Sequence, residues 1–519
     1  MTGPPSAPMS MPPPDPSAAA LRPSSPSPAL DVTASVRNAL KLGGSLMVTY
    51  GIALAVRLLL PRVLGPEAFG QFNWASEGFT AVFFVLVGLG LEVYIRKEVA
   101  LRPEHASEFF GGTLLLQVGL AAGLLALMQG LMVADGKPAH LRLLVLLLGV
   151  YQLFFRCNGT LAAVLHARER VDGLSVANIA TKCVWGGGQL LVLALGLPLP
   201  WLGAPILASE VLRAAVLFRL SRRHAGLQFH VNARGTREAL TGALPFFLNE
   251  AALAANGPMG IFLLGLLTNT TEVGWYGAGW NLAGMTLMAA PVLTWVLLPL
   301  LSRAASQSPE ELTRITRRTL EAVLAFSIPL TLAMGLGADV WIGWVYGEAF
   351  TPAAAVLRLQ APILALTYVA MVCASVLTVT GQGWRVTRTS VVSMVLNATL
   401  NLTLARPFLA WFGPVGGACA SALALFTCES VVVLLLVRAV GHQAFDRQSL
   451  VRLGKTLGIC AVVGGVHVAL AGLGAVRLAV GAALYVLLVF ATGAVRLEEL
   501  RNLMRLVRRR GAPAPASPA

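Results

Sequence analysis

The amino-acid sequence predicts an all-α integral membrane protein with about fourteen transmembrane helices. Hydrophobic residues make up 56% of the 519 residues and charged residues only 12%, and the mean hydropathy is +0.73. A soluble protein of this length would need far more charge to cover its surface. Apolar stretches of roughly 20 residues, the length that crosses a bilayer as a helix, also recur along the whole chain.

Short polar breaks separate the expected spans. Pro245, Pro258, Pro291 and Pro329 fall inside spans, which membrane helices tolerate. If one pair of these stretches does not cross the membrane, the number of spans is twelve. The expected spans lie near 36–60, 74–95, 109–132, 141–163, 174–197, 199–219, 240–267, 276–301, 319–345, 359–380, 387–405, 414–437, 454–473 and 477–496.

Both ends of the chain are expected to be tails outside the bilayer. Residues 1–35 are rich in Pro and Ser and lack the apolar core of a signal peptide, so they predict a disordered cytoplasmic tail. Residues 498–519 form a basic cytoplasmic tail. The run 495–510 places Leu, Met and Val between arginines, which predicts either an interfacial helix or a basic stop after the last span.

The positive charges give the orientation. The net charge is +15, and most of the 39 Lys and Arg residues fall in every second loop. Such loops are cytoplasmic in membrane proteins, so both termini are predicted to be cytoplasmic. Arg far outnumbers Lys, a weak indication of a bacterial gene and therefore of the bacterial cytoplasmic (inner) membrane. No basic face with interleaved aromatic residues is present, so no nucleic-acid partner is expected.

Repeated motifs predict two six-helix lobes. The motif at 70–75 follows the first span, and a similar motif at 274–278 follows the seventh. Each half holds six spans, an even number, so the repeats share one orientation, as in transporters built from parallel repeats. The lobes are expected at 36–223 and 224–440, with two additional helices in 441–497.

Basic side chains within the spans are the first candidates for function. A charge at membrane depth is costly unless it is paired or hydrated. Arg57 lies in the first span, Arg156 in the fourth and Lys182 in the fifth. The planar guanidinium of Arg57 suits a phosphate or carboxylate, and a structural ion pair is the alternative interpretation.

The seventh span adds a polar stripe. Asn249, Glu250 and Asn256 interrupt an otherwise apolar helix, and Asn249 and Asn256 share a helical face. The stripe is expected to face a hydrated cavity. With the three basic residues above, this cavity would be more cationic than anionic, which favours an anionic substrate.

Other acidic residues have simpler interpretations. Glu210 and Arg213 are three residues apart and form either a structural pair or part of a site. The remaining acids lie near span ends, where we expect them to reach the membrane interface: Glu77, Glu92, Glu321 and Glu429.

Sequence motifs for catalysis are missing. The chain has no HExxH, no GxxxxGK[ST] loop and no nucleophile elbow. Its six cysteines have no CxxC spacing, so they are predicted to be packing residues. We therefore expect no enzyme, no metal and no cofactor.

Several short motifs occur in the order found in one known family. They are RVLGPEAFGQF at 62–72, GLGL at 88–91 leading to RKE at 96–98, VGWYGA at 273–278, PLLSR at 299–303 and YGEAF at 346–350. With these motifs, residues 36–440 resemble the polysaccharide biosynthesis (oligosaccharide flippase, Wzx-type) family. That family belongs to the multidrug/oligosaccharidyl-lipid/polysaccharide exporter superfamily.

The resemblance implies two six-helix lobes around a central cavity. It implies translocation of a polyprenyl-pyrophosphate-linked oligosaccharide by alternating access, with no bond made or broken. Under this hypothesis Arg57, helped by Arg156 or Lys182, holds the pyrophosphate. The sugar hydroxyls would contact Asn249, Asn256 and Asn281, and the lipid tail would stay among the membrane lipids.

One departure from the family concerns ion coupling. Many relatives carry an acid late in the seventh span, where this chain has Pro258, Met259 and Gly260. Glu250, about two turns earlier, is the nearest substitute. Coupling through the family position is therefore in doubt.

Two other functions stay open on the sequence alone. A drug/cation antiporter of the same superfamily would want more acids than bases in the cavity. A membrane glycosyltransferase or polymerase would need a large external loop with acidic residues. If the flippase hypothesis is right, polysaccharide polymerase or export machinery is an expected partner.

Overall fold

The computed structural model describes residues 32–101, 106–167, 172–225, 230–441 and 444–493. Most of both predicted tails, residues 1–31 and 494–519, lies outside this part. The chain divides into two compact units, Met1–Val48 and Thr49–Ala519. The described residues of the first unit are the opening turns of one helix, and all other elements belong to the second.

The regular elements of the described residues are all helices, which confirms the predicted all-α class. A π-helix, η2 (Trp74–Thr80), follows α1. The α-helices are α1 (Val32–Asn73), α2 (Ala81–Gly88), α3 (Leu91–Leu101), α4 (Ala106–Ala134), α5 (Ala139–Ala167), α6 (Asp172–Ala194), α7 (Gly203–Ala225), α8 (Ala233–Leu267), α9 (Thr270–Met285), α10 (Ala290–Gln307), α11 (Pro309–Leu336), α12 (Ala338–Tyr346), α13 (Ala353–Val379), α14 (Gly383–Phe412), α15 (Gly416–Val440), α16 (Arg447–Ala469) and α17 (Val476–Ala491).

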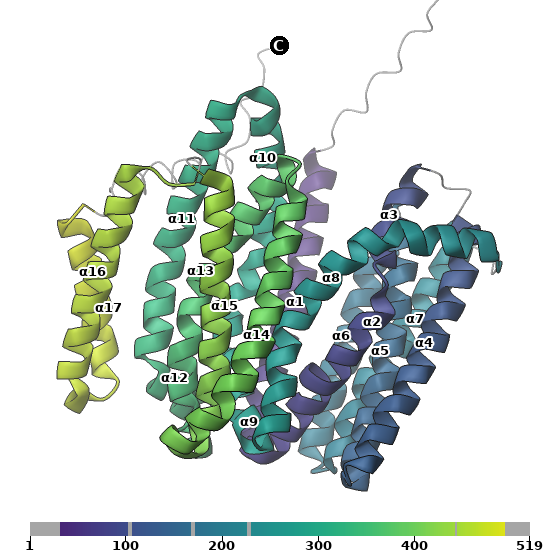
Figure 1. The fold of residues 1–519 in the computed structure, drawn as a ribbon, viewed down its shortest axis with the longest axis horizontal. Helices are drawn as coiled ribbons and strands as arrows, with labels where there is room; N and C mark the ends of the chain where they lie inside the picture. Colours follow the sequence, from purple (N-terminus) through teal and green to yellow (C-terminus); the bar gives the residue numbers. More distant parts are fainter. Residues whose placement is uncertain (1–31, 102–105, 168–171, 226–229, 442–443, 494–519) are drawn as a thin grey trace, which may run out of the picture. The chain divides into compact units, whose positions relative to one another are not determined.

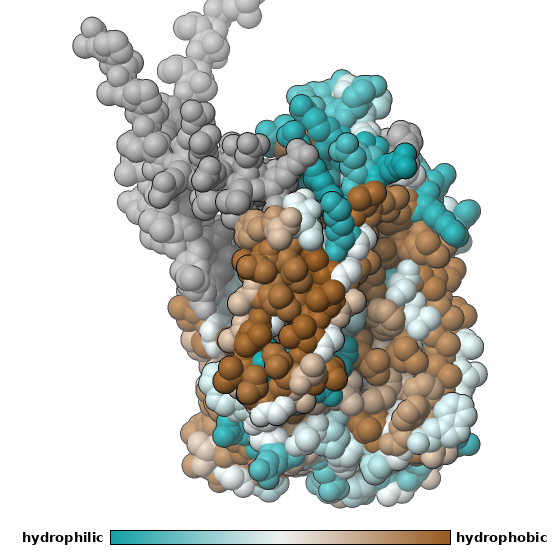
Figure 2. Space-filling view, turned by 90° about the vertical axis from the view of Figure 1, so that its left-hand side faces the viewer, coloured by the Kyte–Doolittle hydropathy of each residue, from teal (hydrophilic) through white to brown (hydrophobic). Residues whose placement is uncertain are grey.

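The protein is a multi-pass membrane protein. Among the described residues, nine stretches are long and apolar enough to cross a bilayer. One of them, Gly383–Val440, contains two helices, α14 and α15. On the face that α16 and α17 turn to the viewer, an apolar band lies between hydrophilic ends (Figure 2).

The predicted connection between the first two spans, at 61–73, contains a break in the helix. α1 extends to Asn73, but its backbone is not helical at Gly65, which has φ 76° and ψ 170°. Glycine adopts this positive φ without the steric cost that other residues meet. Pro66 follows the bend, and the chain then passes directly into η2. The helices before and after Gly65 are therefore separate segments.

Helix α8 contacts helices from both halves of the chain. It packs against α2, α3 and α4, and also against α14 and α15 (Figure 1). Two glycines permit the close approach between α8 and the region of α3. A Cβ on Gly90 would overlap the backbone of Phe247, and a Cβ on Gly242 would overlap the ring of Tyr94. The predicted boundary at 223/224 assigned all of α8 to the second lobe, whereas α8 joins both sets of helices.

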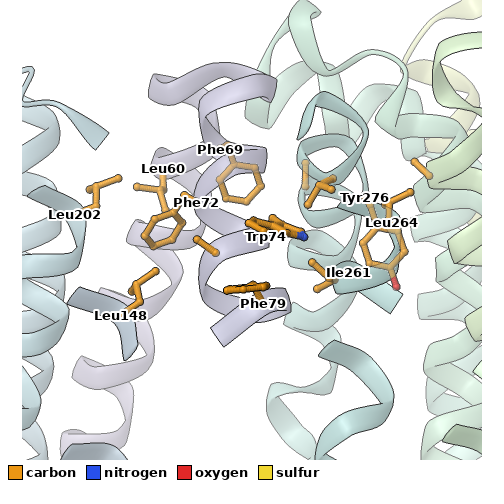
Figure 3. Close-up of a cluster of buried hydrophobic side chains, with 14 of the residues drawn as sticks. Leu60, Phe69, Phe72, Trp74, Phe79, Leu148, Leu202, Ile261, Leu264 and Tyr276 are labelled. Atoms are coloured by element: carbon orange, nitrogen blue, oxygen red, sulfur yellow. The ribbon is translucent and has the colours of Figure 1, made fainter. Parts of the chain in front are cut away.

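An aromatic cluster lies at the end of α1 and in η2. Phe69, Phe72, Trp74 and Phe79 are buried, and the rings of Trp74 and Phe79 stack with centroids 4.9 Å apart. Figure 3 shows these rings between Leu60, Leu148 and Leu202 on one side and Ile261, Leu264 and Tyr276 on the other. In a bilayer such packing is driven by van der Waals contact rather than by removal of water.

Helices α16 and α17 form a hairpin beside α11. Their small apolar core of Ile459, Val463 and Val489 packs against Leu332 and Leu336 of α11. Ion pairs attach the hairpin near both ends. Arg317–Asp446 (3.4 Å) and Arg452–Glu321 (3.5 Å) lie at one end, and Asp339 pairs with Arg477 and with Arg358 (3.5 Å) at the other.

Candidate functional site

Arg57 is accessible in the middle of the chain's first apolar stretch. Its side chain is exposed, and its Nη1 lies 3.8 Å from the position that a Cβ on Gly284 would take. The guanidinium of α1 therefore lies against α9, with room left by the glycine. Arg57 has no hydrogen bond or ion pair with any residue in the described ranges, so the alternative of a structural ion pair finds no support there.

Glu77 lies close enough to Arg57 to interact electrostatically. Its side chain is exposed. The sequence suggested an interface position, because the predicted break at 61–73 put Glu77 near the start of a span. No local motif distinguished Glu77 in advance as a neighbour of Arg57.

A second group of charges surrounds a small cavity between α3, α5 and α8. Nη1 of Arg156 lies 3.8 Å from Oε1 of Glu250. Two glycines make room: a Cβ on Gly88 would lie 3.4 Å from that Nη1, and a Cβ on Gly159 would lie 3.1 Å from Oε2 of Glu92. The cavity is lined by Gly88, Glu92, Gln117, Phe155, Arg156, Gly159, Thr160, Ala162, Arg213 and Glu250.

The volume of this cavity limits what it can hold. It measures about 180 Å³, less than the roughly 300–1,000 Å³ of typical small-molecule pockets. A phosphate group or a few waters fit, whereas an oligosaccharide does not. Glu92, Gln117 and Thr160 were not among the predicted site residues. Their signal was weak, because Gln and Thr are common in membrane helices and Glu92 precedes a charged span end.

Lys182 and the pair Glu210–Arg213 lie between these two groups. Lys182 Nζ is 4.7 Å from the ring centroid of Trp185, and it interacts electrostatically with Glu210, Arg213 and Arg57. Arg213 Nη1 lies 3.5 Å from Glu210 Oε1, and Asn158 donates to Glu210 Oε2 at 2.7 Å. Glu210 and Arg213 thus form the ion pair that the sequence allowed.

The amide residues of the predicted stripe separate in the structure. Asn256 belongs to a hydrogen-bonded chain between α8 and α14, since it donates to Ser393 Oγ at 3.0 Å and accepts from Asn397 at 2.9 Å. Asn397 in turn accepts from Asn401 at 2.6 Å. Asn281 of α9 is half-buried. The side chain of Asn249 lies outside the described part.

The segment after the bend in α1 lies directly against α9. A Cβ on Gly70 would overlap the carbonyl oxygen of Thr270, and a Cβ on Gly274 would overlap that of Pro66. Arg62 adds two hydrogen bonds to the carbonyls of Trp344 and Val345, each 3.3 Å. These contacts join α1 to α9 and α12 at the end of the molecule that is predicted to face outward.

Comparison with known proteins supports a transport fold. The chain is 24% identical over 262 residues to the probable low-salt glycan biosynthesis flippase Agl15 of Haloferax volcanii, a match that covers 50% of this chain and 54% of Agl15. The chain thus spans about half the length of that relative.

Two solved structures share the fold. A lipid II flippase MurJ in an inward closed conformation matches with a TM-score of 0.59 and 12% identity, over 86% of this chain and all of MurJ. An inward-facing multidrug resistance MATE family transporter of the MOP superfamily matches with a TM-score of 0.55 and 15% identity, over 75% of this chain and 95% of that protein. At these identities the likeness concerns the fold alone.

The family itself follows from the sequence match. Residues 35–305, more than half of the chain, match the family described as Polysaccharide biosynthesis protein. That range includes every predicted site residue, from Arg57 to Asn281. The chain belongs to the polysaccharide biosynthesis protein family.

Proposed function

We propose that this protein is a flippase that moves a polyprenyl-pyrophosphate-linked oligosaccharide from the inner to the outer leaflet of the bacterial cytoplasmic membrane by alternating access. The observation that carries the proposal is Arg57: an exposed guanidinium, within an apolar helix, that forms no ion pair or hydrogen bond within the described residues. Such a group is costly in a bilayer unless it serves a ligand or faces water. A pyrophosphate supplies the bidentate oxygen acceptors that a guanidinium prefers.

The proposed topology has fourteen spans, with both termini cytoplasmic. The two lobes, 36–223 and 224–440, would move relative to each other, and the α16–α17 hairpin would stay attached to the second. This arrangement follows from the distribution of Lys and Arg in the loops. It places the Gly70–Gly274 contact on the external side.

Substrate recognition would proceed by charge and hydrogen bonding alone. Arg57 binds the pyrophosphate, and Lys182 lies within electrostatic range to assist it. Arg156 can assist only if it exchanges Glu250 for a phosphate oxygen, because Arg156 Nη1 and Glu250 Oε1 are 3.8 Å apart. Asn281 contacts sugar hydroxyls, and Asn249 is assigned the same role from the sequence.

Asn256 is better explained as a packing residue. Its amide already donates to Ser393 and accepts from Asn397, so both groups are used in the lobe interior. A role for Asn256 toward the sugar would require these bonds to break.

The release step requires the external contact to open. Gly70 and Gly274 bring the two backbones close together at this contact. Opening it would also separate the rings of Phe69 and Phe350, whose centroids lie 6.4 Å apart. The two Arg62 hydrogen bonds would be exchanged for water at the same time.

The test replaces Arg57 with Ala in a strain that depends on this gene for surface polysaccharide. We expect export to fall at least tenfold, since one charge-assisted bond contributes about 1.5–3 kcal/mol, and the lipid-linked intermediate to accumulate inside. The matched control is Arg219→Ala, which removes an exposed arginine near the C-terminal end of α7. Normal export by Arg57→Ala at a normal protein level would exclude the phosphate role.

A drug/cation antiporter is the second candidate. Glu77 and Glu92 join Glu250 near the basic groups, whereas the sequence analysis had placed only Glu250 there. In that case deletion would sensitise cells to cationic drugs and leave polysaccharide export intact.

A further inference from the structure

A second cavity, larger than the one beside Arg156, lies outside the proposed transport site. It measures about 580 Å³ and lies between the first turns of α11 and the start of α16. The proposed orientation, on which this inference rests, places these turns at the cytoplasmic headgroup level. Its lining consists of Pro309, Glu310, Thr313, Arg314, Arg317, Arg318, Glu321, Asp446 and Ser449.

Several residues of the cavity lining form the contacts that hold α16 against α11. Arg317 pairs with Asp446 at 3.4 Å, and Ser449 Oγ donates to Glu321 Oε1 at 2.7 Å. Arg452 pairs with the other oxygen of Glu321 at 3.5 Å. Acids and bases balance among these residues, so they offer a ligand little net charge.

The lining also contains a stripe of three exposed charges on the same helix, α11. Glu310, Arg314 and Arg318 are four residues apart and therefore lie on one face. Arg314 bonds Glu311, but its side chain is still 58% exposed. Glu310 and Arg318 have neither a hydrogen bond nor an ion pair with the residues that the structure describes. The stripe thus presents one acid followed by two bases.

Exposed apolar side chains occur on the two helices that line the cavity. Phe326 of α11 is 56% exposed, and Leu450 and Leu457 of α16 are each 55% exposed. Figure 2 shows an apolar surface below the hydrophilic end of the molecule on the side of α16 and α17. A ligand with a charged head and acyl chains fits this order of surfaces.

We propose that this cavity binds the headgroup of an ethanolamine phospholipid. Arg318 and Arg314 hold the phosphate, and Glu310 holds the ammonium. Glu310 and Arg314 are four residues apart, about 6 Å along the helix, a distance that the short ethanolamine linker spans. Arg318 is about 12 Å from Glu310 along the helix, so its long side chain reaches the phosphate from the membrane side. Arg318 lies nearest the hydrocarbon region, where a lipid phosphate sits, and Glu310 lies one to two turns farther into the cytoplasm, as the ammonium requires.

The mixture of charges selects this lipid over an anionic one. A phosphatidylglycerol headgroup has no cation to pair with Glu310. The Glu310 carboxylate would then repel the lipid phosphate. Inorganic phosphate would meet the same carboxylate and would leave the apolar part of the groove empty. Clusters of basic residues alone favour anionic lipids, and this groove differs from them by its acid.

The test measures lipid binding to the full-length protein by native mass spectrometry. Purified protein is titrated with phosphatidylethanolamine, phosphatidylglycerol or inorganic phosphate. We expect phosphatidylethanolamine to bind more tightly than phosphatidylglycerol, and Arg318→Gln to weaken it about tenfold, the loss of one charge-assisted hydrogen bond. Glu310→Gln should remove the preference between the two lipids. Arg237→Gln, on an exposed turn of α8, should change nothing.

Three results would overturn the proposal. They are equal or tighter binding of phosphatidylglycerol by the unaltered protein, phosphatidylethanolamine binding that neither variant changes, and displacement of the lipid by equimolar inorganic phosphate. If Arg318→Gln does not fold, Glu310→Gln alone decides, because the lipid preference depends on that carboxylate. Transport is not measured, so the outcome is independent of the flippase proposal.

Discussion

Two arginines in the apolar part of the chain differ in what surrounds them. Arg57 is exposed and lies beside a glycine, whereas Arg156 lies between Glu250 and Glu92 and its side chain is only 18% exposed. An arginine held between carboxylates stabilises the protein, and one without such partners is available to a ligand. Replacing Arg156 is therefore expected mainly to lower stability, whereas replacing Arg57 is expected mainly to lower transport.

The Arg156–Glu250 pair can be tested by a double-mutant cycle. Arg156→Gln or Glu250→Gln alone should lower the thermal midpoint in detergent, because each leaves a partly buried charge without its partner. The double variant should recover part of the loss, with a coupling of about 1 kcal/mol. Additive losses would mean that the 3.8 Å pair contributes nothing to stability.

At the scale of elements, the bend in α1 determines what the following segment can contact. Gly65 turns the chain so that Gly70 meets α9 and the aromatic residues of η2 pack between helices from both halves. The N-terminus of α15 is joined to the same region, since buried Glu272 of α9 accepts from Ala418 N–H at 2.7 Å. Orphan amides at a helix start are often satisfied in this way.

The glycine contact predicts a conformational effect of a single methyl group. Gly70→Ala or Gly274→Ala would place Cβ into a backbone carbonyl, so we expect the external side to separate. Spin labels at Val63 and Trp344, both exposed, in a background without native cysteines should move apart in pulsed electron resonance. Gly51→Ala is the control, because a Cβ there meets nothing within 4 Å. An unchanged distance in both variants would show that the contact does not hold this side closed.

At the scale of the whole molecule, the α16–α17 hairpin is attached mainly through charged groups near its ends. Its apolar contact with α11 is small, and lipid tails can replace such contacts at little cost. Asp446 is central at one end, because it caps α16 by accepting from Ser449 N–H at 2.7 Å and pairs with Arg317.

This attachment predicts a dependence on acid. The backbone N–H of Ser449, together with Arg317, holds the pKa of Asp446 below its usual range. A depressed folded-state pKa gives stability that is present above the unfolded pKa of about 3.9 and is lost as pH falls through the folded value. Hydrogen exchange in the first turn of α16, relative to the intrinsic amide rate at each pH, should therefore be unchanged from pH 8 to 5 and accelerate below about 4. Asp446→Asn keeps a capping oxygen and should lose this acceleration; if it does not, another group titrates.

The sequence by itself determined the properties that depend on local composition. Apolar length predicts membrane-crossing helices, loop charges predict an orientation, and the ordered motifs indicated a family that the match over residues 35–305 confirms. Arg57 was also identified in this way, since any arginine within a long apolar stretch stands out. These signals are local, because water and lipid act on each segment whatever its neighbours are.

Only the tertiary structure decided which residues meet. It brought Arg156 and Glu250, 94 positions apart in the chain, to 3.8 Å, and it brought Glu77 within electrostatic range of Arg57. It also placed Asn256 in a chain of hydrogen-bonded amides with α14. It also showed that α8 packs against both sets of helices. These contacts depend on a bend at Gly65 and on close helix approaches at other glycines. The sequence shows where a glycine allows a close approach, but it does not show which helix packs there.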